Sequence, residues 1–210
     1  VVSVAQMIPE LSCAILSGGF SKRFGSNKAL VSWKDKTMIE TLQGECSKVS
    51  SHLFIVTKDS ETYRGVATEK TQIILDEDVK QHPFCGIYAA LKAAPTEYLF
   101  ITACDMPFIS TSLIQTLWDH RLKGQVIVPM WNRNPQVLCA LYHRSCLEKV
   151  DTLRKTEGKV QDLLSSVNTC YLNKQDMASI RCYSEAFMDL DTPSDYSKAL
   201  SLLERGSVRC

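Results

Sequence analysis

The sequence lacks the patterns that define disulfide-rich and zinc-binding proteins. Its nine cysteines are scattered, odd in number and never spaced as C-x-x-C, so neither a disulfide framework nor a zinc site is predicted. Its four histidines also show no metal-ligand spacing. We therefore expect a protein of the reducing cytoplasm, in which cysteines such as Cys13 and Cys139 act as small buried hydrophobic residues.

Long apolar runs and an excess of one charge are missing too. The first apolar run, residues 1–5, is too short for a secretory or membrane segment and has no basic leader. The 24 Lys and Arg against 23 Asp and Glu leave a net charge of +1, so neither a membrane nor a nucleic acid is an expected partner. With 210 residues, 45% of them hydrophobic, we expect one domain over residues 12–205. Residues 1–11 would be an extension, part of which we expect to be non-native.

The two best-known phosphate-binding patterns, G-x-x-x-x-G-K-[ST] and G-x-G-x-x-G, are also absent. Instead, the adjacent glycines Gly18 and Gly19 follow the apolar run 13–16 and precede a segment that becomes helical. Their backbone N–H groups can converge on an anion, and Arg23 and Lys28 add positive charge. This arrangement suits a polyphosphate, and an ordinary turn is an equal alternative on the chemistry alone.

Apolar runs typical of strands alternate with segments of helical periodicity. Repeated alternation predicts a mainly parallel sheet with helices on both faces and ligands at the carboxyl ends of the strands, where Gly18 and Asp105 fall. Residues 82–86 are expected to form a loop, and the short connection after the fifth strand predicts a hairpin-like pair. Strands are expected near 13–16, 53–56, 72–75, 98–102, 125–129, 137–142 and 169–172, and helices near 38–49, 87–93, 110–118, 145–154, 159–165 and 194–204.

Three motifs point to a known family. Residues 16–30, LSGGFSKRFGSNKAL, resemble the L-A-G-G-x-S-x-R-M-G-x-D-K-A-L signature of the molybdenum cofactor guanylyltransferases and their relatives. Residues 103–108, ACDMPF, resemble the family's C-D-M-P-F metal-site motif, and residues 83–87, PFCGI, resemble its G-P-L-A-G-I loop. The resemblance runs from about Cys13 to about Leu203. It implies an α/β fold, a Rossmann-like three-layer αβα sandwich of the nucleotide-diphospho-sugar transferase type with some antiparallel strands.

The resemblance also implies an activity and a set of site residues. Family members are Mg²⁺-dependent nucleotidyltransferases that join GMP from GTP to molybdopterin, the molybdenum cofactor, to give molybdopterin guanine dinucleotide and pyrophosphate. Cofactor-insertion and recipient enzymes are implied as further partners. By matching positions, Lys28, Arg23 and Asp105 would be catalytic, and Arg133, Asn134 and Gln136 would lie in the acceptor loop. The implied nucleotide-binding residues are Leu16, Ser17, Gly18, Gly19, Lys28, Asp76, Gly86 and Asp105, with Asp105 also on the metal.

The chain departs from the family pattern at several positions. Asn27 replaces an aspartate, His82 replaces the leading glycine of the third motif, and no asparagine follows the second strand around residues 56–58. The usual N-x-N-T-P-x-D reads DLDTPSD at residues 189–195, so Asp189 and Asp191 replace two amides. Asp191 is the candidate for a second metal ligand, as in relatives with D-x-D-T-P-x-D, some of which use cytidine nucleotides. An equal alternative is that it caps the last helix.

The same motifs also fit rival activities. The enzyme could be a cytidylyltransferase for the same cofactor, or act on another small phosphate, and a nucleotide-binding regulatory module without turnover is the non-enzymatic rival. At single residues, Asp105 could cap the next turn, Lys28 and Arg23 could be solvated surface cations, and Asp76 could belong to a solvated acidic turn with residues 77–78. The motifs favour nucleotidyl transfer more strongly than they favour guanine over cytosine.

Overall fold

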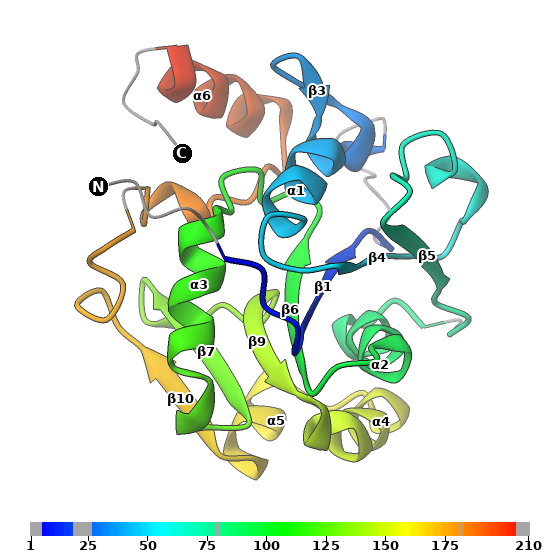
Figure 1. The fold of residues 1–210 in the computed structure, drawn as a ribbon, viewed down its shortest axis with the longest axis vertical. Helices are drawn as coiled ribbons and strands as arrows, with labels where there is room; N and C mark the ends of the chain where they lie inside the picture. The colour runs from blue at the N-terminus through cyan, green and yellow to red at the C-terminus, as the bar shows by residue number, and fades with distance from the viewer. Residues whose placement is uncertain (1–5, 19–26, 79, 181, 205–210) are drawn as a thin grey trace.

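The computed structural model of the chain describes residues 6–18, 27–78, 80–180 and 182–204. A mixed eight-stranded sheet has the strand order β10-β7-β9-β6-β1-β4-β5, with β8 paired to β7 beside this path (Figure 1). Its strands are β1 Leu11–Leu16, β4 His52–Thr57, β5 Thr71–Leu75, β6 Tyr98–Ala103, β7 Val126–Trp131, β8 Asn134–Pro135, β9 Cys139–His143 and β10 Thr169–Leu172.

The direction of the strands sets where the site can form. β1 pairs in parallel with both β4 and β6, and β4 pairs in parallel with β5, so these four strands end at the same edge of the sheet. β7 and β10 are parallel, whereas β9 is antiparallel to both β6 and β7. The mainly parallel sheet and the hairpin-like pairing of β7 with β9 are thereby confirmed.

Helices cover both faces of the sheet. On one face α1 (Met38–Cys46) and α3 (Thr111–Asp119) pack over Cys13 and Ile15, and on the other α2 (Pro83–Ala93), α4 (Leu147–Thr156) and α5 (Val160–Ser166) pack with Ala14. This alternation along β1 is the period of two that a strand imposes on its side chains. Cys13 and Cys139 are fully buried, as expected.

A smaller apolar cluster lies near the carboxyl end of the chain. It joins α6 (Pro193–Glu204), seen in Figure 1 beside β3, to the hairpin of β2 (Ser32–Trp33) and β3 (Lys36–Thr37), which the apolar pattern did not predict. Trp33 packs edge-on against Phe108 with ring centroids 5.3 Å apart. Through this contact, the hairpin, which follows Lys28 in the chain, packs against the segment that follows Asp105.

The start of α2 corrects one expectation. Residues 83–86 are the first turn of this helix and not a loop, because His82 is its N-cap and Pro83 occupies the first helical position. The His82 Nδ1 accepts a hydrogen bond from the Phe84 backbone N–H at 3.2 Å, and proline fits here because this position needs no N–H partner. Histidine is not among the preferred capping residues, so the pattern hid this start.

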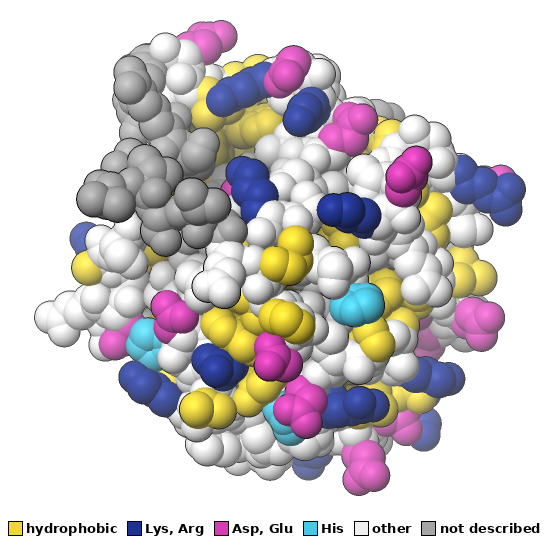
Figure 2. All heavy atoms as spheres, in the orientation of Figure 1, with side chains coloured by type: hydrophobic (Ala, Val, Ile, Leu, Met, Phe, Trp, Pro, Cys, Tyr) yellow, Lys and Arg dark blue, Asp and Glu magenta, His cyan; other side chains and the backbone are white. Residues whose placement is uncertain are grey.

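Three further features concern surface charge, cysteine pairing and helix length. Positive and negative side chains are interspersed on the face shown in Figure 2, in keeping with the net charge of +1. Seven described cysteines are free thiols and Cys182 is disulfide-bonded, which the scattered spacing did not predict. Across the described ranges, no helix combines the length and the apolar character needed to cross a membrane.

Candidate active site

A cavity of about 380 Å³ opens where the carboxyl ends of β1, β4, β5 and β6 meet. Leu16, Val56, Gly86, Ala103 and Leu138 supply much of its lining. Two groups of charged residues complete it on opposite sides of β1. The first consists of Lys28, Asp105 and Asp191, and the second of Lys58 and Asp76.

Lys28 is the central residue of the first group. Its Nζ lies 2.5 Å from Asp191 Oδ1 and 3.4 Å from Asp105 Oδ2, and the residue is only 8% exposed. Desolvation alone would lower the pKa of Lys28, but the hydrogen bond with Asp191 and the charges of both carboxylates raise it above its ordinary value. Lys28 is therefore a fixed, protonated cation and not a solvated surface lysine.

Asn27 explains how Lys28 is positioned. The Asn27 Oδ1 accepts the backbone N–H of Ala29 and caps the short 3₁₀ turn Lys28–Leu30, while its Nδ2 donates to the Tyr63 hydroxyl at 2.9 Å. The same hydroxyl lies 2.5 Å from Ser17 Oγ. Tyr63 is buried, and desolvation raises its pKa. An amide suits this position because it both donates and accepts, so the departure from aspartate has a structural use.

A backbone hydrogen bond of the neighbouring residue Leu190 holds Asp191 at the site. The Leu190 N–H donates to the Asp105 carbonyl at 3.0 Å, which holds residues 189–191 against the turn after β6. The cap of α6 is provided instead by Thr192 and Asp195: the Thr192 N–H donates to Asp195 Oδ2 at 3.0 Å, and the Asp195 N–H donates to Thr192 Oγ1 at 3.2 Å. The hypothesis that Asp191 is the helix cap is therefore wrong.

The donor set at this point fits a hard divalent cation. Asp105 and Asp191 both face the Lys28 ammonium, so their oxygens lie close together. Within the described ranges, no three His, Cys, Asp or Glu residues form a group able to hold a metal ion by themselves. Mg²⁺ is commonly held by one or two carboxylates together with water and substrate phosphates, so two carboxylates are sufficient.

Asp189 adds a third carboxyl group beside these two. Partial desolvation, together with repulsion from Asp105 and Asp191, raises the pKa of Asp189 to about 6 from an ordinary value of 3.8. A raised acidic pKa means that the folded protein binds this proton more tightly than the unfolded chain does. The contribution of Asp189 to the free energy of unfolding is therefore favourable at low pH and falls as the pH rises through this window.

We expect Asp189→Asn to stabilise the metal-free protein above about pH 6, and to have little effect near pH 4. Because the side chain is exposed, solvent screening limits the gain to less than about 1 kcal/mol. Urea unfolding in the presence of a chelator, followed from about pH 4 to about pH 8, measures the difference. If the free energies of unfolding of the parent and the variant differed by a constant amount over this pH range, the raised pKa of Asp189 would be contradicted.

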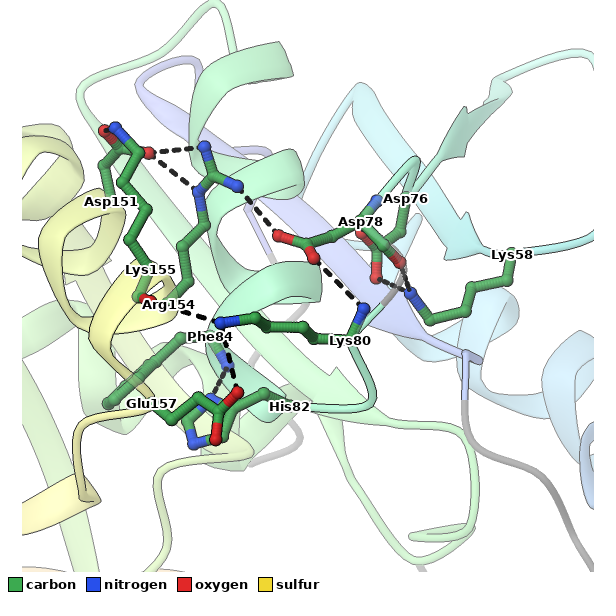
Figure 3. A network of polar contacts seen from close by, with 10 residues as sticks. All are labelled: Lys58, Asp76, Asp78, Lys80, His82, Phe84, Asp151, Arg154, Lys155 and Glu157. Atoms are coloured by element: carbon green, nitrogen blue, oxygen red, sulfur yellow. Dashed lines mark hydrogen bonds and ion pairs between the residues drawn. The ribbon is translucent and has the colours of Figure 1, made fainter.

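The second charged group has its own network, drawn in Figure 3. Lys58 Nζ lies 3.0 Å from Asp76 Oδ2 and also donates to the Asp78 carbonyl. The Asp78 carboxylate accepts from Arg154 Nη1 at 2.8 Å, and Arg154 Nε donates to Asp151 Oδ1 at 2.7 Å. Asp76 is only 9% exposed, so it is an ion-paired residue of the cavity and not part of a solvated acidic turn.

The structure brings most of the predicted residues together. Ser17 is not among the described residues that line the cavity, and its side chain bonds Tyr63. Gly19 and Arg23 lie outside the described residues. Arg133, Asn134 and Gln136 are not among the described residues that line the cavity. The predicted residues that do line it are Leu16, Gly18, Lys28, Asp76, Gly86, Asp105 and Asp191.

Sequence reasoning missed three groups of contributors to the site. Lys58 could have been found, because it directly follows β4 at the edge where ligands bind. Gln81 and His82 also line the cavity. His82 begins the segment that was expected to be a loop, and Gln81 precedes that segment. Tyr63 carried no signal, since it is a lone aromatic residue within a polar segment.

The three-layer arrangement, the mainly parallel sheet and the lysine between carboxylates at its carboxyl edge define a nucleotidyltransferase-like α/β protein. A family model described as "MobA-like NTP transferase domain" matches residues 13–170. The chain belongs to this family, as the three motifs predicted, and membership supports an enzyme of the nucleotidyltransferase class.

The chain is similar in sequence to named relatives over nearly its whole length. The chain is 30% identical over 195 residues to a probable molybdenum cofactor guanylyltransferase of Carboxydothermus hydrogenoformans, covering 91% of this chain and 96% of the relative. It is 29% identical over 202 residues to one from Natranaerobius thermophilus, with 94% and 98% covered. The structure of molybdopterin-guanine dinucleotide biosynthesis protein A from Archaeoglobus fulgidus has the same fold, with a TM-score of 0.80, 21% identity, and 92% and 99% of the two chains covered.

Proposed function

We propose that this protein transfers GMP from GTP to molybdopterin, forming molybdopterin guanine dinucleotide and releasing pyrophosphate, with Mg²⁺ as the metal. The supporting observation is the protonated Lys28, held between Asp105 and Asp191 at the cavity where β1 ends. A buried cation beside two carboxylates suits the transfer of a charged phosphoryl group. The relatives' names support guanine as the base and molybdopterin as the acceptor.

The reaction needs few groups from the protein. A terminal phosphate oxygen of molybdopterin attacks the α-phosphorus of GTP and forms a new P–O bond. The bond from the α-phosphorus to the bridging oxygen of the β-phosphate breaks, and pyrophosphate leaves with that electron pair. The attacking phosphate is already anionic near neutral pH, so no general base is required, and catalysis consists of positioning and charge neutralisation.

Each residue has a defined part in this scheme. Lys28 opposes the negative charge that builds up around the α-phosphate, and Gly18 lets the donor phosphates approach the backbone at the end of β1. Asp105 and Asp191 would hold Mg²⁺, which when bound neutralises and orients the donor phosphates. Asn27, through its cap on the turn that carries Lys28, keeps the ammonium in place.

A cytidylyltransferase for the same cofactor is the second candidate. It is favoured by one observation: Asp189 and Asp191, the residues that replace two family amides, lie at the site, and Asp191 contacts Lys28. Cytidylyl and guanylyl transfer would use the same phosphate and metal groups, so the two candidates differ only at the base.

The test is pyrophosphate release from GTP, CTP and ATP, with Mg²⁺ and molybdopterin. We expect turnover with GTP, formation of molybdopterin guanine dinucleotide, and loss of turnover when the metal is chelated. Faster turnover with CTP than with GTP would support the same transfer mechanism with cytosine in place of guanine as the base. Nucleotide binding without turnover in any reaction would favour the regulatory module.

A further inference from the structure

Lys58 and Asp76 occupy the side of the cavity away from the catalytic lysine. Asp105 follows β6, Lys58 follows β4 and Asp76 follows β5 in the sheet order β6-β1-β4-β5. Three inter-strand spacings therefore separate the ends that carry Asp105 and Asp76, which is about 14 Å. This span matches an extended nucleoside monophosphate. A donor whose α-phosphate lay at Lys28 would extend its base across this cavity toward Lys58 and Asp76.

The pair is held in a defined position. Asp76 Oδ1 accepts the Asp78 backbone N–H at 3.1 Å, and the Asp76 N–H donates to the Thr57 carbonyl at 2.7 Å. The Lys58 ammonium contacts Asp76 and the Asp78 carbonyl, which occupies two of its three N–H donors. The Lys58 side chain also passes close to the phosphate-binding backbone, because its Cγ would lie 3.8 Å from a Cβ added to Gly18.

A clamp from α4 supports this arrangement. The Arg154 guanidinium lies 4.0 Å from the centre of the Tyr88 ring. It also bonds both Asp78 and Asp151, as Figure 3 shows. Arg154 therefore holds the Asp78 carboxylate in place, and the carbonyl of the same Asp78 accepts a hydrogen bond from Lys58. A lysine side chain has many rotamers, and such a support reduces the entropy lost when it binds a ligand.

The donor and acceptor pattern of the pair matches one base. An ammonium only donates hydrogen bonds and a carboxylate only accepts them. Guanine places the O6 acceptor next to the N1–H and N2–H₂ donors on one edge. Adenine presents an amine where guanine has O6, and cytosine has one amine beside two acceptors. We propose that Lys58 is a specificity residue that donates to O6 of guanine while Asp76 accepts from N1 and N2.

This inference rests on the proposed function, and it is tested without the acceptor. Calorimetric titration of the full chain with GTP, ITP, CTP and ATP, in the presence of Mg²⁺, gives the four affinities. Lys58→Met should weaken GTP and ITP equally, by about ten- to hundredfold, because both carry O6. The affinity for ATP should change little. Asp76→Asn should weaken GTP more than ITP, because ITP lacks the N2 amine.

Control variants distinguish a loss of base recognition from a general loss of nucleotide affinity or of folding. Lys70→Met removes an exposed lysine outside the cavity lining and should leave all four affinities unchanged. Lys58→Arg keeps the charge and the N–H donors and should retain a preference for GTP over ATP. Circular dichroism melting curves establish that each variant is folded.

The outcomes distinguish this inference from the proposed function. A parent protein that binds none of the nucleotides would overturn the proposed function itself. A parent that prefers GTP, with Lys58→Met binding GTP as tightly or losing GTP and ATP by the same factor, would overturn only the assignment of Lys58. A parent that prefers CTP would overturn the guanine assignment and leave the transfer chemistry in place.

Discussion

Replacing Asp105 by asparagine is expected to reduce pyrophosphate release by about 10³-fold or more. The amide keeps the shape of the side chain but removes the charge that would hold the metal against the donor phosphates. Asp105 follows β6 with Cys104 between them, its carbonyl accepts the Leu190 N–H, and its carboxylate faces Lys28. The backbone contact survives the substitution, so the fold should be kept. Single-turnover measurements with saturating GTP show whether the loss lies in the chemical step.

Asp119→Asn is the matched control. Asp119 is an exposed carboxylate at the end of α3, where it bonds Gln115, and it is not among the residues that line the cavity. Its substitution removes the same charge and should leave turnover within about twofold of the parent. Turnover by Asp105→Asn at the parent rate would remove Asp105 from the catalytic machinery and favour another metal carboxylate.

Replacing Lys28 by methionine should lower kcat/KM for GTP by about 10²- to 10³-fold. Methionine fills similar space without the ammonium, so the donor would lose the cation that we propose faces its α-phosphate. Asp105 and Asp191 would also face each other without the charge that now lies between them. Both effects act on the phosphate end of the cavity, so the preference for GTP over ATP should persist while turnover falls.

The comparison with Lys70→Met measures how much of this loss is specific, because that variant removes one exposed positive charge from another part of the chain. Melting curves of both variants show whether the protein stays folded. Parent-like kcat/KM in Lys28→Met would assign Lys28 to a structural role, as the partner of two carboxylates, and would move the catalytic cation elsewhere.

The order of strands and helices follows from local patterns. Apolar runs such as the one that forms β1 are read directly from the chain, and residues at their ends, including Asp105 and Gly18, were expected at the binding edge. The error at α2 has a local cause: the cap is a histidine ring and proline begins the helix, so residues 83–86 resembled a turn. The β2–β3 hairpin is too short for any periodicity to show.

The roles of single carboxylates could not be decided in this way. Capping preferences allowed Asp191 to be either a helix cap or a site residue. The structure assigns the cap to Thr192 with Asp195 and leaves Asp191 on Lys28. Asp76 was equally ambiguous until its ion pair with Lys58 placed it in the wall of the cavity.

The sequence by itself determined the α/β class, the family and the identity of Lys28 and Asp105 as central residues, because these depend on periodicity and on short motifs. Only the tertiary structure decided which charges meet. Lys28 contacts Asp191 across 163 positions, and Ser17 reaches Tyr63 across 46. Such contacts depend on β1 lying between β4 and β6 and on the path of the chain back to that edge. Local side-chain periodicity records which face of a strand is buried, but not which strand lies beside it.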